Sequence, residues 1–186
     1  MFNRNELKRL VEKEIKGDFF VPRHINSCFK NLDLIKESFF DEETVFAGIF
    51  LHSVGFPMSV KFNQDLISTS LNLGKKILVK SHFPMEKTEQ VFYCIKESHL
   101  KGNPKTTESI LVHDLNLLDE IGSIGIIKDI ILFNSRKILF QKFLEEEKTK
   151  SFLLKKAFFS EKAKLLAGEK LILFDSFVSA LEKELK

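Results

Sequence analysis

The residue types best suited to chemistry in this sequence are histidine and aspartate, and they are scattered along the chain. His24, His52 and His99 lie far apart, and a further histidine is followed directly by an acid in the pair His113-Asp114. Imidazole and carboxylate groups bind metal ions and transfer protons when folding brings them together. The chain has no Ser-His-Asp spacing, Gly-rich phosphate loop, Cys-x-x-Cys or His-Glu-x-x-His. Either distant residues assemble a site, or each histidine is an ordinary packed or helix-terminal residue.

Length and composition predict one globular domain over residues 1–186. The chain has 186 residues, of which 44% are hydrophobic and 30% charged, and this excludes disordered and low-complexity classes. The net charge of +3 is too small to indicate a nucleic-acid partner. Two cysteines, no signal-peptide pattern and apolar runs shorter than a membrane span favour a cytoplasmic protein without a membrane partner. The sequence leaves open whether the protein forms a homo-oligomer.

Apolar residues recur at three- and four-residue spacing along the chain, which predicts an all-α fold. We expect helices at about 5–16, 22–39, 41–52, 64–80, 88–99, 106–121, 126–147, 152–166 and 170–186. The helix that begins at Asp41 is apolar almost all round and should lie deep in the core. The acidic run 145–147 should be a solvated face or a helix end. In the pairs Phe19-Phe20, Phe39-Phe40 and Phe158-Phe159, one ring should stay exposed or line a cleft, because neighbours on a helix point about 100° apart.

Two segments resemble a known family. The stretch FAGIFLHSVG at 46–55 resembles the Ala-Leu-Leu-His-Asp-Ile-Gly core of the HD superfamily. The stretch IKESH at 95–99, then Pro104, Thr106 and LVHDLNLLDEIGSIGI at 111–126, is similar to a subgroup pattern: Ile-x-x-His, Pro-x-Thr, Asp-Ala-Asp-x-Leu-Asp-x-Ile-Gly-x-x-Gly-Ile. With the similar segment 157–184, the resemblance covers nearly the whole chain. HD proteins are helical metal-dependent phosphohydrolases, so the resemblance implies an HD-like helical bundle with that activity.

The resemblance also implies a site. In the family an early His, a later His-Asp pair and a distant Asp bind one divalent metal, and these positions correspond to His24, His52 and Asp114. The implied ion is Mn, Co, Mg, Ni, Fe or Zn, and the implied substrate is a small phosphorylated metabolite or nucleotide. His99 and Asp114 are the implied catalytic residues. Arg23 and Lys128 are the implied contacts of the substrate phosphate.

Several positions depart from the family pattern. Ser53 replaces the Asp of His-Asp, Asn116 replaces the second Asp of the late motif, and Phe20 stands where related sequences carry a His. A neutral hydroxyl is a poorer ligand for a hard cation than a carboxylate is. Two interpretations therefore stay open: a phosphohydrolase with a weakened metal centre, and a catalytically inactive HD fold that binds a ligand or a protein. Without the resemblance, Asp114 reads as a buried carboxylate bonded to a helix cap, and Lys128 as the partner of an acid.

Overall fold

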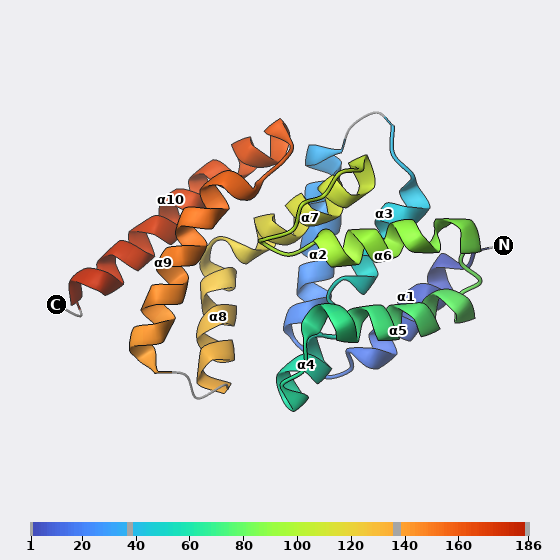
Figure 1. Ribbon diagram of the computed structural model, residues 1–186, viewed down its shortest axis with the longest axis horizontal. Coiled ribbons are helices and arrows are strands. Elements are labelled where there is room, and N and C mark those ends of the chain that lie inside the picture. The colour runs from blue at the N-terminus through green and yellow to red at the C-terminus, as the bar shows by residue number, and fades with distance from the viewer. Residues whose placement is uncertain (1, 37–38, 136–138, 185–186) are drawn as a thin grey trace.

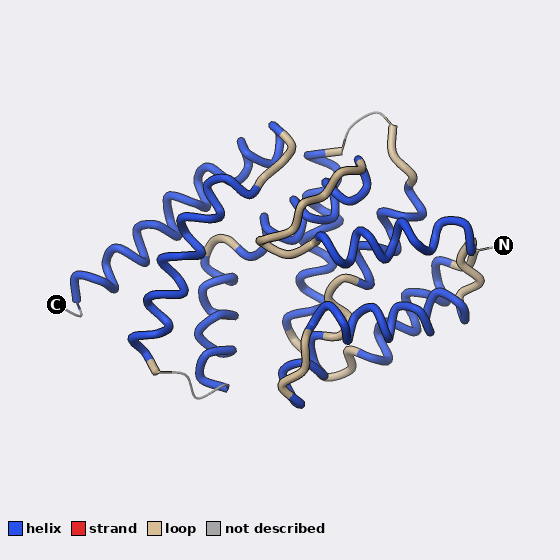
Figure 2. Tube along the Cα trace, in the orientation of Figure 1, coloured by secondary structure: helices blue, strands red, loops and turns tan. Residues whose placement is uncertain are grey.

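The computed structural model describes residues 2–36, 39–135 and 139–184. These residues form helices and loops, with no strand among them (Figure 2), so the all-α prediction is confirmed. The elements are α1 (Arg4–Glu14), α2 (Phe20–Ile35), α3 (Glu42–Leu51), α4 (Phe56–Phe62), α5 (Leu66–Lys80), a short 3-10 turn η1 (Met85–Lys87), α6 (Thr88–Glu97), α7 (Thr107–Glu120), α8 (Ser123–Ser135), α9 (Phe140–Ala157) and α10 (Glu161–Glu184).

The helices are arranged along the long axis of the molecule with α7 at the centre (Figure 1). Helices α8, α9 and α10 lie toward the end that carries the C-terminus, and α1 to α6 lie on the other side. Helix α7 packs against α2, α3, α6, α8 and α10. Every side chain from Leu111 to Asp119 on this helix is buried. Polar residues on α7 are therefore forced to find partners on the neighbouring helices.

Helix α3 is the second buried element, as its all-round apolar sequence predicts. Its contact with α7 and α6 is close at Gly48, where an added Cβ would lie 2.8 Å from Val112 Cγ2 and 3.4 Å from Cys94 Cβ. The stretch Glu42–Phe62, which comprises α3 and α4, is apolar and long enough to cross a membrane by length and composition alone, but 61% of its apolar window is buried inside the fold. Helix α3 is part of the core, whereas Ser59 is the only buried residue of α4.

Side-chain caps explain where several helices begin. The Asp41 carboxylate accepts a hydrogen bond from the Thr44 amide at the start of α3, as the sequence predicts. Thr106 and Ser109 cap each other's amides at the start of α7. The first helix is capped by Asn3 rather than by Asn5.

The C-terminal helices differ from the predicted ones. The predicted helix 126–147 is two helices, since α8 ends at Ser135 and α9 begins at Phe140; residues 136–138 lie outside the described part of the chain. The predicted helix 152–166 is also wrong, because the chain breaks between Ala157 and Glu161. Glu147 is buried in α9, so the prediction of a solvated acidic run is correct only for the first two of its residues.

The exposure of the phenylalanine pairs follows the expectation. Phe19, Phe39 and Phe159 are exposed, whereas their neighbours in the sequence are partly or fully buried. Phe20 lines a pocket.

Candidate functional site

A pocket of about 360 Å³ lies where α2, α4, α7 and α8 meet the C-terminal end of α3. Its polar wall contains most of the residues that the sequence singles out, together with acids that it does not, among them Asp119 and Glu120. The polar and charged residues of interest here are Arg23, His24, His52, Ser53, His99, Asn116, Asp119, Glu120 and Lys128.

The centre of this wall is a pair of histidines in direct contact. His24 Nε2 lies 2.7 Å from His52 Nε2. His24 Nδ1 lies 2.8 Å from Asp119 Oδ2, and His52 Nδ1 lies 3.1 Å from the Gly48 carbonyl oxygen. The carboxylate and the carbonyl only accept hydrogen bonds, so both Nδ1 atoms carry protons. The short contact between the two Nε2 atoms then holds one proton, and one of the two rings is an imidazolium.

The environment of each ring decides which one carries the charge. Burial, with the neighbouring His24 charge, lowers the pKa of His52 to about 3. Burial opposes the charge on His24 too, but Cys28 and the hydrogen bond to Asp119 outweigh it and raise the pKa of His24 to about 9. The pKa of Asp119 is well below its usual range because His24 and Arg23 outweigh the effect of burial. His24 is therefore the imidazolium, and it donates to a neutral His52.

The backbone around His52 is held by a serine from α5. Ser70 Oγ donates to the His52 carbonyl oxygen at 3.1 Å and accepts from the Gly55 amide at 3.1 Å. A Cβ on Gly55 would lie 2.7 Å from the Ser70 amide nitrogen, so only glycine allows this approach. The turn after α3 thus aims His52 at α2.

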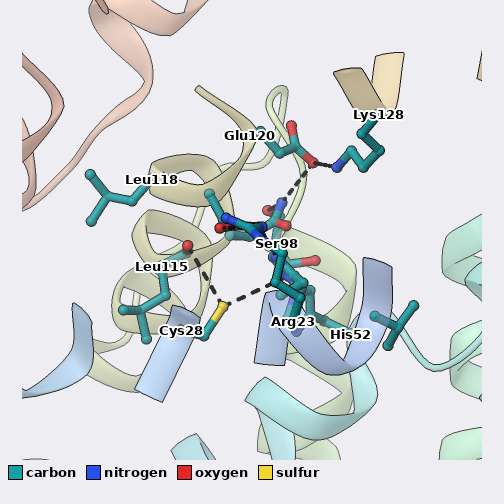
Figure 3. A network of polar contacts seen from close by, with 12 residues as sticks. Arg23, Cys28, His52, Ser98, Leu115, Leu118, Glu120 and Lys128 are labelled. Carbon is teal, nitrogen blue, oxygen red and sulfur yellow. Dashed lines mark hydrogen bonds and ion pairs between the residues drawn. The ribbon is translucent and has the colours of Figure 1, made fainter. Parts of the chain in front are cut away.

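Helix α2 contributes Arg23, His24 and Cys28 to the surroundings of the histidine pair. Arg23 Nη1 contacts both carboxylate oxygens of Asp119 at 3.0 Å. Cys28 is one helical turn after His24 and fully buried. Its thiol donates to the Leu115 carbonyl oxygen at 3.7 Å and lies 3.7 Å from His24 Nε2 (Figure 3). The donor atoms of His24, Cys28 and His52 all lie within 4.8 Å of one another, a grouping that can bind a metal ion.

The three positions that depart from the family pattern all line the pocket, and two of them, Ser53 and Asn116, are polar. The Ser53 hydroxyl is buried and has no hydrogen-bond partner among the described residues. Asn116 Nδ2 donates to the Ser98 carbonyl oxygen at 2.8 Å and to Glu120 Oε1 at 3.3 Å. The pocket therefore has neutral oxygen atoms where the family pattern has carboxylates.

The structure does not bring Asp114 to this pocket. Its carboxylate accepts hydrogen bonds from the Phe159 amide at 3.0 Å and the Ser160 amide at 2.8 Å, directly before α10, and lies 3.2 Å from His113 Nδ1. The geometry thus runs against the expected role of Asp114 in the metal set, because both of its oxygens are used at a helix N-terminus. Asp119 is the carboxylate that contacts the histidine pair, through His24. Its place in the Leu-Asp-x-Ile-Gly part of the late motif was the available signal.

The other predicted residues lie on the pocket wall, at different distances from the histidine pair. His99 Nδ1 accepts from the Lys101 amide at 3.1 Å, so a neutral His99 carries its proton on Nε2. Lys128 lies 3.7 Å from Glu120 Oε1 (Figure 3), which makes it the partner of an acid as well as a wall residue. Burial raises the pKa of Glu120, but Lys128 and Lys150 outweigh burial and lower it to about 2.

Comparisons with known proteins support the fold. No family model and no curated protein matches the sequence. A predicted HD-superfamily hydrolase from an uncultured Thermotogales bacterium has a similar structure, with a TM-score of 0.62, 16% identity, and coverage of 98% of this chain and 92% of that one. A Lactobacillus plantarum protein is similar with a TM-score of 0.73, 18% identity, and coverage of 100% and 98%. The chain therefore shares its helical fold with these structures, one of which is a predicted HD-superfamily hydrolase, as the sequence predicts.

Another structure with this fold is Bacillus subtilis YpgQ, solved in complex with ADP. It is similar over 98% of this chain and 97% of its own, with 17% identity and a TM-score of 0.67. At these identities the likeness concerns the fold.

Proposed function

We propose that the protein is a metal-dependent phosphohydrolase that acts on a small phosphorylated molecule, with His24 and His52 as the histidine ligands of a divalent ion. One observation carries the proposal: the two Nε2 atoms meet at 2.7 Å while both Nδ1 atoms are held, one by Asp119 and one by Gly48. Metal-binding histidines are held in this way, with the second nitrogen bonded to a carboxylate or a carbonyl. The residues therefore fit a metal ion, which would take the place of the shared proton.

The donor set favours certain ions. Imidazole nitrogen suits Zn, Co, Ni and Fe better than Mg, whose preferred ligands are oxygen atoms. Asp114 remains the family-implied third ligand, but using it would require freeing its carboxylate from the start of α10. A bound ion of this class polarises a phosphoryl oxygen and activates water for attack on phosphorus.

The chain's own residues position the substrate and move protons. The Arg23 guanidinium is held by Asp119 through one nitrogen, which leaves other N–H groups free to donate to a phosphate. Lys128 adds a second cation on the wall of the pocket. His99 lines the pocket with its proton on Nε2, and in this proposal it donates that proton to the leaving group. Phe20 and Phe56 form an apolar wall for the rest of the substrate.

A second function has its own supporting observation. Ser53 and Asn116 put neutral groups on the pocket wall, so the metal centre lacks the carboxylates that hold and orient water in the family. In that case the protein binds a phosphorylated ligand without turning it over, as a ligand-binding or interaction module.

A hydrolysis screen separates the two functions. Nucleotides, including ADP, and simple phosphoesters would be tested with Mn, Co, Ni, Zn, Fe and Mg, and ADP binding measured by calorimetry. Turnover that His52→Ala abolishes and His82→Asn leaves unchanged supports the hydrolase, because His82 is exposed and lies outside the pocket. ADP binding without turnover, with hydrolysis gained by Ser53→Asp combined with Asn116→Asp, supports the binding module. If the screen finds neither ADP binding nor turnover, both functions are overturned.

A further inference from the structure

Cys28 lies in direct reach of the histidine pair but has no place in the family's ligand pattern. It follows His24 by four residues on α2, so the two side chains share one face of the helix. The thiol is fully buried. It belongs to the hydrophobic core, and its polar contacts are with the Leu115 carbonyl oxygen and His24 Nε2, both at 3.7 Å.

The three donor atoms lie within 4.8 Å of one another, and two of the distances between them are close to those around a tetrahedral metal ion. With metal–nitrogen bonds of about 2.0 to 2.1 Å and metal–sulfur bonds of about 2.3 Å, two such ligands lie about 3.6 Å apart. His24 Nε2 and Cys28 Sγ already lie 3.7 Å apart. Two imidazole ligands would lie about 3.3 Å apart, so His52 has to move by only about half an ångström from its contact at 2.7 Å.

A second, independent observation points to a ligand in the pocket that His24 and His52 line. The Ser53 side chain is 8% exposed, its hydroxyl has no hydrogen-bond partner among the described residues, and it lines the pocket beside His52. A buried hydroxyl without a partner costs free energy unless something binds it. A ligand or water held in this pocket would satisfy the hydroxyl.

The charge of the site gives the reason for a sulfur ligand. The family pattern supplies negative charge to the ion from carboxylates, but Ser53 is neutral here, and the oxygens of Asp114 accept hydrogen bonds from the two amides before α10. A cysteine ligand coordinates as the thiolate. One thiolate thus restores a negative charge that the missing carboxylates do not supply.

We propose that Cys28 is the third protein ligand of the metal ion, so that the centre is a two-histidine, one-thiolate site that selects Zn²⁺ and Co²⁺ over Mg²⁺ and Mn²⁺. On binding, a metal–sulfur bond forms, and the thiol proton and the proton shared by the histidines pass to the buffer. The fourth position is left for water or a substrate oxygen. The inference rests on the metal site of the proposed function. It changes the preference of that site from ions that favour oxygen ligands to ions that also bind sulfur.

Cobalt spectroscopy tests the ligand directly. The full-length protein would be titrated with Co²⁺, and the near-ultraviolet band of thiolate-to-cobalt charge transfer recorded for the wild type, Cys28→Ser and Cys94→Ser. Cys94 is the matched control, because it is also fully buried but lies on α6, outside the cluster. We expect the band in the wild type and Cys94→Ser and its loss in Cys28→Ser, together with Zn²⁺ affinity at least about 10- to 100-fold lower in that variant.

X-ray absorption at the zinc edge keeps the proposal testable even if Cys28→Ser does not fold. In the wild type it should show one sulfur neighbour at about 2.3 Å among nitrogen and oxygen neighbours. Bound Co²⁺ or Zn²⁺ without the band and without the sulfur neighbour overturns the role of Cys28, and leaves the hydrolase proposal to be decided by its own screen. If the wild type holds no bound ion, and His24→Ala and the wild type give the same result in the metal titration, the metal site itself is overturned.

Discussion

Asp114 and Asp119 lie on the same buried helix but face different neighbours. They are 119 − 114 = 5 residues apart, which corresponds to about 140° of rotation around a helix axis. Asp114 accepts the two amides that precede α10, whereas Asp119 binds Arg23 and His24 on α2. The side of α7 that carries Asp114 therefore stabilises the start of α10, and the side that carries Asp119 forms part of the candidate site. The position of an aspartate in the motif therefore does not determine its role, because the role depends on which neighbouring helix the side chain faces.

A third buried carboxylate, Glu147 on α9, lacks what the other two have. Its Oε2 atom is buried and has no hydrogen-bond partner among the described residues. Burial, with the neighbouring Asp129, raises the pKa of Glu147 to about 7. Asp114 and Asp119 are buried with partners, whereas Glu147 is buried without full compensation, and it should cost stability when it is charged.

Removing Asp114 should have the largest effect on the fold. In Asp114→Ala two amides at the start of α10 lose their acceptor in a buried place, and we expect a loss of about 3 to 4 kcal/mol in the free energy of unfolding. Urea denaturation measures it, with Asp33→Ala as the exposed control. If Asp114→Ala instead keeps full stability and loses Zn²⁺ binding, Asp114 is a metal ligand, as the family resemblance implies, and not a helix cap.

Glu147→Gln should stabilise the protein, and more so at high pH. A carboxyl whose pKa is higher in the folded state than its ordinary value of 4.5 costs stability as pH rises from about 4.5 through about 7. The glutamine removes that cost, and we expect a gain of about 2 kcal/mol at pH 8 and much less at pH 5. Thermal unfolding at the two pH values checks this. Glu146→Gln, at the exposed neighbouring position, should show no such dependence; equal gains at both pH values would contradict the prediction.

Asp119→Asn should weaken the metal site with little effect on the fold. The amide oxygen still accepts from His24 Nδ1, but the negative charge that orients and polarises the ring is gone. Loss of such a supporting carboxylate lowers metal affinity by about 10-fold or more. Zinc titration measures it, and Asp114→Asn is the matched control on the other side of α7. Equal losses in the two variants would erase the distinction between the two sides.

The smallest expected effect is on stability in Arg23→Gln. The Arg23 side chain is 36% exposed, so its ion pair with Asp119 should contribute less than about 1 kcal/mol. If Arg23 contacts a substrate phosphate, ADP binding should fall several-fold in calorimetry, whereas Arg9→Gln, at an exposed pair on α1, should leave it unchanged. Unchanged ADP binding in Arg23→Gln would limit Arg23 to a positioning role.

Local sequence predicts much of the N-terminal part of the fold. The caps at Asp41 and Thr106 and the all-round apolar character of α3 are local signals, and the structure agrees with them. The two helix ends that present His24 and His52 are local as well, and the resemblance predicted that they meet. The short helix α4 was not predicted, because its seven residues carry too little periodicity.

Tertiary contacts decided those features of the fold and the site that local sequence did not predict. Residues 152–166 contain no proline and read as one helix, yet the chain turns at Phe158–Ser160 because a carboxylate from α7 binds the amides there. Glu147 reads as part of a charged, solvated run, yet packing of α9 buries it. The sequence by itself determined the helical fold, the histidine pair and the absence of acids at positions 53 and 116. Only the tertiary structure decided which aspartate of α7 meets the histidines and that Cys28 lies beside them, because both depend on how distant helices rotate against one another.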